Sequence, residues 1–406
     1  MNRLGSFLLP LLLVLVAAPA VEAQGSFKYG NSLQFTSDDE QVKIKVGGRI
    51  MSHWTWWSED EEFSTAGADP EDGVIFRRAR LYMSGTIFGN IGFKGQYEFA
   101  GGDVDFTDAY LEFKDVAYVG NVRVGQQHET FGLETLTSSN YMTFIERSSG
   151  SGPIAPGRST GIKLVDVLEQ ENMRLSVGAY RDSDSDGDDV ADNAYSFTGR
   201  FSYLPWEDED SGDLVHVGLG ASIRNPEDDM IRYAADPSVR PSVDFLDTGM
   251  QSVDMVTLIG LEAASVHGPL SFQGEYMMAM NDGADGTDDF DVSDFYVQVS
   301  YFLTGEQRPY NYKRGSFGRI KPKANYGSEE GNGAWELALR YGMTDFDDGS
   351  INGGTMSQIT GGVTWYLNPL VRVRANVVVI DVEDIAGNAG LDGNAEAFTM
   401  AFHIDF

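Results

Sequence analysis

The chain of 406 residues has no cysteine, only five histidines and no long apolar run after its first 23 residues. Without thiols it can form no disulfide, thiolate metal site or cysteine nucleophile. Without a run of about 20 apolar residues there is no candidate for a membrane-spanning helix, so any spanning must be done by strands. No nucleophile motif stands out beside the few histidines. The sequence therefore predicts a protein that is not an enzyme and needs no cofactor.

Basic residues are also scarce, because 29 Lys and Arg stand against 62 Asp and Glu, for a net charge of −33. A chain this acidic is not expected to bind nucleic acid, whose phosphates attract basic proteins. What is abundant is glycine, with 47 residues, together with 24 phenylalanines and 18 tyrosines. This composition favours one large barrel over two or three soluble domains.

The N-terminus has the pattern of a secretory signal peptide. Arg3 supplies a positive charge, residues 7–20 are apolar, and Val21-Glu22-Ala23 offers a cleavage site of the small-residue type. A membrane anchor is the alternative, but the run is short and contains a proline. We expect a signal peptide at 1–23, a periplasmic segment at 24–41 and a barrel at 42–406.

The last residues alternate strictly in character. Apolar side chains occupy every second position of 398–406, and alanine or polar residues lie between them. A period of two describes a strand with one greasy and one wet face, as the closing strand of an outer-membrane barrel requires. We expect Phe406, the terminal residue, to be recognised by the barrel-assembly machinery.

Sixteen segments of about 9 to 13 residues can be marked between turn signals, the length of a tilted membrane strand. Their expected starts are Val42, Val74, Ile91, Val104, Asn121, Thr160, Asn172, Ala194, Leu214, Ser252, Leu270, Val292, Ala334, Thr355, Val371 and Ala395. An even number leaves both termini on the periplasmic side. The predicted fold is an all-β, transmembrane antiparallel barrel of about 16 strands, with long extracellular loops and a pore-constricting loop.

The lengths of the connections agree with an even number of strands that alternate in direction. Short links near 88–90, 267–269 and 368–369 fall on the periplasmic side, and long links fall outside. The expected long links are 58–73, 129–159, 181–193 and 225–251. The long segment 304–333 is an exception on the periplasmic side; it is either an insertion that folds into the mouth or a sign that the count is wrong by one hairpin.

A large β-sandwich or a propeller is the soluble alternative. Aromatic residues at expected strand ends favour the membrane barrel, because such residues form interfacial girdles. The residues are Trp54, Trp56, Trp57, Tyr301, Phe302, Trp365 and Tyr366.

The link 129–159 is longer than most loops of a compact fold, and long loops are usually functional or disordered. We expect it to enter the barrel and narrow it, with Arg147 and Arg158 as its charged residues. A flexible surface loop is the alternative.

The charged residues can be sorted by their place on each expected strand, where even and odd positions face opposite sides. This sorting, here called parity, separates the two signs. The faces opposite the apolar positions carry more bases than acids, whereas acids collect in the loops. The bases are Lys43, Lys45, Arg49, Arg78, Arg80, Lys94, Arg123, Lys163, Arg174, Arg200, Arg224, Arg340, Arg372 and Arg374. The acids are Glu98, Asp108, Glu112, Asp254, Glu262, Glu275, Asp294, Glu336 and Asp405.

A water-facing inner surface with an excess of positive charge concentrates anions, and rings of Arg or Lys select anions and phosphate. We therefore expect an anion path. Its residues would be Arg49, Arg78, Arg80, Lys94, Arg123, Arg340, Arg372 and Arg374. The alternative is that these arginines merely pair with lumen acids and hold the barrel round.

One acidic loop resembles the opening of a calcium-binding loop. Asp182, Asp184 and Asp186 alternate before Gly187, but Asn193 stands where the motif requires a bidentate Glu. A solvated acidic loop is the alternative to this weak metal candidate.

Several motifs together resemble the phosphate-selective porin O and P family of Gram-negative outer membranes. The resemblance runs from about residue 40 to the C-terminus. It is carried by residues 47–50, 76–81, 108–112, 123–125, 308–310, 318–323 and 333–341. It implies a 16-stranded barrel in the outer membrane, a homotrimer surrounded by lipid and lipopolysaccharide, and passive diffusion of small anions such as phosphate or polyphosphate. It also implies that 304–323 belongs to the channel entrance.

The chain departs from the family pattern at 225–251. The family's phosphate-selective members line the outer half of their path with arginines, whereas here acids outnumber bases in that segment. An anion would meet an acidic vestibule first. A general, weakly selective porin for small hydrophilic solutes is therefore the second hypothesis.

Overall fold

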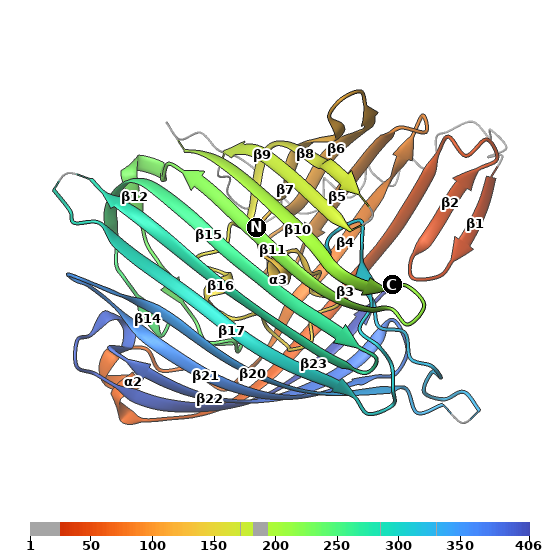
Figure 1. The fold of residues 1–406 in the computed structure, drawn as a ribbon. Coiled ribbons are helices and arrows are strands. Elements are labelled where there is room, and N and C mark those ends of the chain that lie inside the picture. The colour runs from red at the N-terminus through yellow and green to blue at the C-terminus, as the bar shows by residue number, and fades with distance from the viewer. Residues whose placement is uncertain (1–24, 171, 182–193, 285, 330) are drawn as a thin grey trace, which may run out of the picture.

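The computed structural model describes residues 25–170, 172–181, 194–284, 286–329 and 331–406. Within them, sixteen antiparallel strands form a closed barrel (Figure 1), because β23 (Gly393–Asp405) pairs with β3 (Lys43–Glu59). The predicted fold class is confirmed. The predicted signal peptide and the candidate metal ligands Asp182, Asp184 and Asp186 lie outside the described residues.

The strands follow one another around the wall in chain order. After β3 come β4 (Gly73–Ile87), β5 (Ile91–Glu98), β6 (Asp105–Val116), β7 (Gly120–His128), β8 (Arg158–Gln170), β9 (Met173–Arg181), β10 (Tyr195–Asp208) and β11 (Asp213–Arg224). The remaining strands are β15 (Gln251–His267), β16 (Leu270–Gly283), β17 (Phe290–Phe302), β20 (Ala334–Asp348), β21 (Ile351–Tyr366), β22 (Val371–Glu383) and β23. The largest difference from the expected starts is at β21, which begins at Ile351 rather than Thr355.

Alternation places apolar side chains outside and polar ones inside along most of the wall. On β11, Leu219 is 48% exposed, whereas His216 and Ser222 are fully buried inside the barrel. On β23, Phe402 and Ile404 face outward and His403 is buried. The period of two therefore identifies the inward face correctly on these strands.

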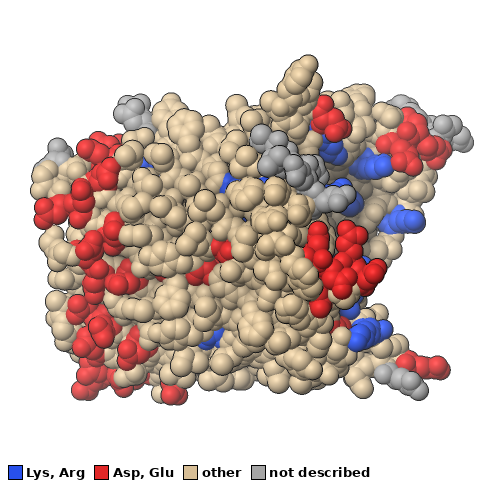
Figure 2. Space-filling view, viewed as in Figure 1, with Lys and Arg blue, Asp and Glu red and all other residues tan. Residues whose placement is uncertain are grey.

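The two ends of the barrel differ in their connections. At one end, here called the turn end, the links 88–90, 117–119, 268–269 and 367–370 are short. The other end, the loop end, carries the long links 60–72, 225–250 and 384–392. Acidic residues gather along the loop end in Figure 2, while the middle of the visible surface consists mostly of uncharged residues.

The long loops are folded rather than extended. They contain α2 (Glu61–Ala66), β12 (Met230–Ile231), β13 (Ala234–Ala235), β14 (Leu246–Asp247), η2 (Glu227–Asp229) and η3 (Ile385–Gly387). Phe63, Phe245 and Ile385 pack with inward-facing residues of β22 such as Val378 and Ile380 in one apolar core. On this part of β22 the inward-facing side chains are apolar, although parity predicts polar ones. The reason is that the loops cover this part of the inner wall and exclude water from it.

Residues 25–37, expected as a periplasmic segment, form the hairpin of β1 (Gly25–Tyr29) and β2 (Leu33–Ser37). β2 pairs with the first residues of β3, before the seam with β23 begins at Arg49. Lys43 and Lys45 lie on this extension and are exposed, and Lys43 contacts Glu40. The expectation that these two lysines face the lumen is wrong, because they lie beyond the closed part of the wall.

The segment between β17 and β20 is a real insertion at the turn end, so the strand count is correct. It contains a small sheet of β18 (Tyr310–Asn311) and β19 (Ser316–Phe317). Buried Arg308 donates a hydrogen bond to Gln273 of β16 over 2.7 Å and stacks on the Phe317 ring. The insertion therefore enters the barrel and packs against its inner wall.

The aromatic prediction is correct only in part. Trp54, Trp56 and Tyr301 are exposed on the outer surface. Phe302 and Tyr366 instead point inward and pack with Ile320 of the insertion. Neighbours along a strand face opposite sides, so only one residue of each adjacent pair can belong to an outer girdle.

No helix within the described residues has both the length and the apolar character needed to cross a bilayer.

Candidate functional site

The link between β7 and β8, residues 129–157, folds into the barrel and is called the inner loop. It contains α3 (Leu133–Leu136) and η1 (Ser149–Ser151). The Phe131 ring lies where a side chain on Gly220 or Gly260 of the wall would be, so these two glycines make room for it. Most of the loop is buried, as expected for a loop that narrows the lumen.

Acids of the β15–β20 wall hold the backbone N–H groups of the inner loop. Glu275 of β16 accepts hydrogen bonds from the N–H groups of Leu133 and Glu134, at 2.6 and 2.7 Å. Asp294 of β17 accepts from the Gly150 N–H and the Ser148 hydroxyl, at 3.1 and 2.9 Å. These carboxylates supply partners that a loop withdrawn from water would otherwise lack.

Arginines of β20 and β22 bind the carbonyl groups of the same loop. Arg340 donates to Glu146 O over 3.2 Å, Arg372 to Ser139 O over 2.7 Å, and Arg374 to Phe144 O. These three predicted path residues therefore lie behind the inner loop and hold it in place.

Arg147 bonds the inner loop to itself. Its guanidinium donates to the carbonyls of Glu134 and Thr137, at 2.9 and 2.7 Å. Arg158, expected on the constricting loop, is instead the first residue of β8. Pro156 and Gly157 directly precede it, and β8 begins two residues before the expected start at Thr160.

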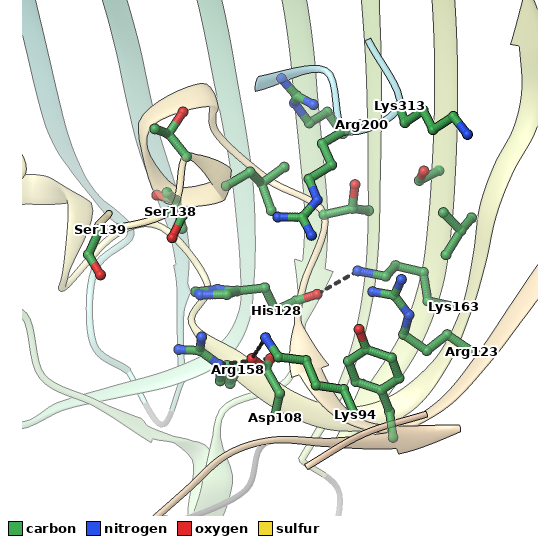
Figure 3. Close-up of a pocket in the computed structure, with 18 of the residues that line it drawn as sticks. Lys94, Asp108, Arg123, His128, Ser138, Ser139, Arg158, Lys163, Arg200 and Lys313 are labelled. Atoms are coloured by element: carbon green, nitrogen blue, oxygen red, sulfur yellow. Dashed lines mark hydrogen bonds and ion pairs between the residues drawn. The ribbon is translucent and has the colours of Figure 1, made fainter. Parts of the chain in front are cut away.

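Below the inner loop, towards the turn end, lies a cavity of about 280 Å³, called the basic cavity (Figure 3). Twelve cationic side chains line it, and Asp108 is the one carboxylate among the described lining residues. The cations are Arg49, Arg78, Arg80, Lys94, Arg123, Arg147, Arg158, Lys163, Arg174, Arg200, Lys313 and Arg314. Five of the eight predicted strand residues of the path are in this list, and both predicted loop arginines are too.

Some of these cations have acidic partners. Asp108 lies between Lys94 and Arg158, at 2.7 and 3.1 Å, as the dashed lines in Figure 3 show. Other pairs join strands within the wall. They are Arg80 with Glu98, Arg123 with Glu112 and Arg200 with Glu262.

Other cations of the basic cavity have no carboxylate within 4.0 Å in the described part of the chain. Arg49 donates to the Ser139 hydroxyl over 2.6 Å, and the Lys163 ammonium donates to the His128 carbonyl over 2.7 Å. Both bonds leave the positive charge uncompensated. The alternative that lumen arginines merely neutralise lumen acids therefore fits only part of this set.

Towards the loop end a second cavity of about 440 Å³, called the vestibule, is lined by both signs of charge. Arg77 and Glu146 meet there at 2.8 Å. Burial alone would raise the pKa of Glu146, but nearby Arg77 and Arg78 hold it well below the usual range. Arg147 lines both cavities and therefore lies between them.

The vestibule also contains Asp236, which is paired with Arg240. Burial raises the pKa of Asp236 to about 7, against the lowering effect of Arg240. This carboxylate therefore changes charge near neutral pH.

Arg77 points into the lumen, although its odd position beside Arg78 predicts that it faces outward. The register between β3 and β4 shifts there, because Met51 pairs with Arg78 and Ser52 pairs with Phe76. The extra residue of this bulge lets Arg77 and Arg78 both reach Glu146 inside the barrel. A bulge leaves no clear mark in the sequence, although three arginines within five residues are a hint.

No group of three or more His, Asp or Glu side chains among the described residues is arranged to hold a metal ion.

A closed sixteen-stranded barrel with a loop folded into its lumen is the architecture of a porin. The sequence profile of the family Phosphate-selective porin O and P matches residues 41–406, and the chain belongs to this family. It is therefore an outer-membrane porin, as the motifs predicted, and its loop end is extracellular and its turn end periplasmic.

Individual relatives agree with this placement. Porin O of Pseudomonas aeruginosa is 26% identical over 93% of this chain and 92% of that protein. Among solved structures, an anion-selective porin from Comamonas acidovorans has a TM-score of 0.55 at 13% identity, covering 89% of this chain and all of the other. A trimer form of OmpT from Vibrio cholerae has a TM-score of 0.53 at 14% identity, covering 90% and 99%. The two structural likenesses concern the fold.

The anchoring of the inner loop can be tested at Glu275. Glu275→Ala leaves two buried N–H groups of α3 without acceptors, at about 1–3 kcal/mol each. We expect a lower free energy of unfolding in urea and a larger, noisier single-channel conductance. Glu275→Gln removes the same charge but keeps an acceptor oxygen, so its conductance should lie nearer the parent value. Equal conductance in all three proteins would contradict this role.

The titration of Asp236 predicts pH-dependent selectivity. Its raised pKa means that it is charged above about pH 7 and neutral below. Lowering the extracellular pH from 8 to 6 should therefore raise the anion-to-cation permeability ratio. The rise should stay below about thirtyfold, since one charge at about 4 Å in water shifts the energies of an anion and a cation by about 1 kcal/mol each, in opposite directions. Asp236→Asn should give a flat profile in reversal-potential recordings, and a slope unchanged by that substitution would assign the effect elsewhere.

Proposed function

We propose that the protein passes small anions by passive diffusion along the vestibule, past Arg147 and through the basic cavity. The observation that carries the proposal is the composition of the basic cavity, with twelve cations and one carboxylate. Cations without carboxylate partners attract an anion, and several of them in sequence let it move on without a deep trap.

The size and chemistry of the basic cavity favour compact oxyanions such as phosphate, or the units of a polyphosphate. Arginine forks donate paired hydrogen bonds to such oxygens. The hydroxyls of Thr135, Ser138 and Ser139 on the inner loop add further donors to the same cavity. The name of the family, Phosphate-selective porin O and P, points to the same class of solute.

The mixed vestibule favours the second candidate, a weakly selective porin. Arg232 is held by Asp247 through bonds of 2.8 and 2.7 Å, and Asp244 adds negative charge to the lining. Such an entrance gives an arriving anion little attraction. Selectivity would then arise only in the basic cavity.

We further propose that the chain assembles as a homotrimer surrounded by lipid and lipopolysaccharide, in keeping with the trimer form of OmpT. Phe406 would present the signal for the barrel-assembly machinery. Its backbone bonds to Gly48 at 2.8 and 3.0 Å in the finished barrel, so this backbone is free to pair with another protein only before closure. Chemical cross-linking in the membrane should yield dimer and trimer bands, and monomers alone would contradict the trimer.

The basic cavity can be tested by removing its unpaired charges. Arg49→Gln combined with Lys163→Gln removes two charges and leaves no acid without a partner. We expect the anion-to-cation permeability ratio in planar bilayers to fall severalfold, since each charge is worth about 1 kcal/mol at about 4 Å. Phosphate should block the chloride current of the parent and block the double variant less.

The matched control is Lys28→Gln with Lys45→Gln, which removes one exposed charge from the β1–β2 hairpin and one from the extension of β3 that pairs with it. It should keep the parent ratio. If both double variants behave alike, the basic cavity does not set selectivity. If the ratio falls but phosphate never blocks, the general porin is correct.

A further inference from the structure

Behind the inner loop, on a part of the wall that lines neither cavity, a buried arginine lies near a buried histidine. Arg374 of β22 lies opposite Ala401 of β23, and Ala401 lies opposite His53 of β3. The two polar side chains therefore share one row across the wall, separated by a methyl group. Arg374 and His53 are 1% and 0% exposed, and neither lines the basic cavity or the vestibule.

Several nitrogen atoms of this row have no hydrogen-bond partner in the described structure. They are Nε and Nη2 of Arg374 and both ring nitrogens of His53. The guanidinium of Arg374 makes one bond, from Nη1 to the carbonyl of Phe144. Leaving a buried charged donor without an acceptor costs about 1–3 kcal/mol or more, so such groups normally have a partner.

The charge of this row is also unbalanced. Glu146 lies 3.6 Å from both His53 Nδ1 and Arg78 Nη2, and it bonds Arg77 at 2.8 Å. This carboxylate is therefore already shared. Arg374 has no acid within 4.0 Å in the described part of the chain. Arg77 and Arg78 share Glu146 and line the vestibule and the basic cavity, so the buried charge left without a carboxylate in this row is that of Arg374.

We propose that this row binds one small monovalent anion, of the halide class, between Arg374 and His53. Water could satisfy the unpartnered donors, but it cannot offset the buried charge of Arg374, and uncompensated buried charge is strongly destabilising. A halide accepts hydrogen bonds from any direction, so it suits donors that converge from two strands over the methyl of Ala401. A dianion would lose more hydration in a closed site.

The bound anion would have a structural role. It would hold the guanidinium that binds Phe144 O and so fix the middle of the inner loop, while transported ions pass on the other side of that loop. This role is independent of the proposed transport, because the site does not line the path.

The experiment is anomalous diffraction from crystals of the full protein grown in sodium bromide. We expect a bromide peak within hydrogen-bond distance of Arg374 and His53, and no such peak in Arg374→Met. Arg340→Met removes another loop-binding arginine and should keep the peak. An ordered inner loop with no anomalous peak at this row would overturn the proposal and assign the site to water.

A solution measurement covers the case in which Arg374→Met does not crystallise or fold. The melting temperature of the detergent-solubilised parent should rise saturably with chloride or bromide, compared with gluconate at equal ionic strength. His53→Phe should reduce that rise. Equal melting in halide and gluconate would overturn the proposal, whatever the permeability ratio proves to be.

Discussion

A polypeptide loop that enters a barrel must find partners for its backbone N–H and C=O groups, and this requirement organises the lumen. Glu275 and Asp294 accept hydrogen bonds from the N–H groups of the inner loop, and Arg340, Arg372 and Arg374 donate to its carbonyls. These five charged residues of the wall from β16 to β22 are therefore engaged in hydrogen bonds with the loop. The charges of the wall from β3 to β10 remain turned towards open space, and most of them are positive.

This division explains how a chain with a net charge of −33 can hold a cationic cavity. The acids of the lumen are either engaged with the loop, as Glu275 is, or paired within the wall, as Glu112 is with Arg123. Many of the remaining acids lie in the loops, and acidic side chains gather along the loop end in Figure 2. The sign of the whole protein and the sign of its interior are therefore separate properties, set by different segments.

Much of the fold could be predicted from the sequence, because a strand between lipid and water must alternate. The strand count and the lumen positions of Arg49, Arg80 and Lys94 follow from that period. Backbone irregularity and tertiary contact could not be predicted. The bulge at Arg77 shifts parity locally, and Val378 and Ile380 are apolar and inward because folded loops cover them. Nor does parity separate a lumen arginine that faces a cavity from one, such as Arg374, that holds a loop.

The seam of the barrel joins strands from opposite ends of the chain. Ala395 pairs with Glu59, Asp405 pairs with Arg49, and Phe406 bonds to Gly48. Contacts between residues so distant in sequence form late, because the intervening chain must first give up its freedom. The cylinder consequently cannot be completed until β23 is available to pair with β3, so the barrel closes only after every intervening strand has been made.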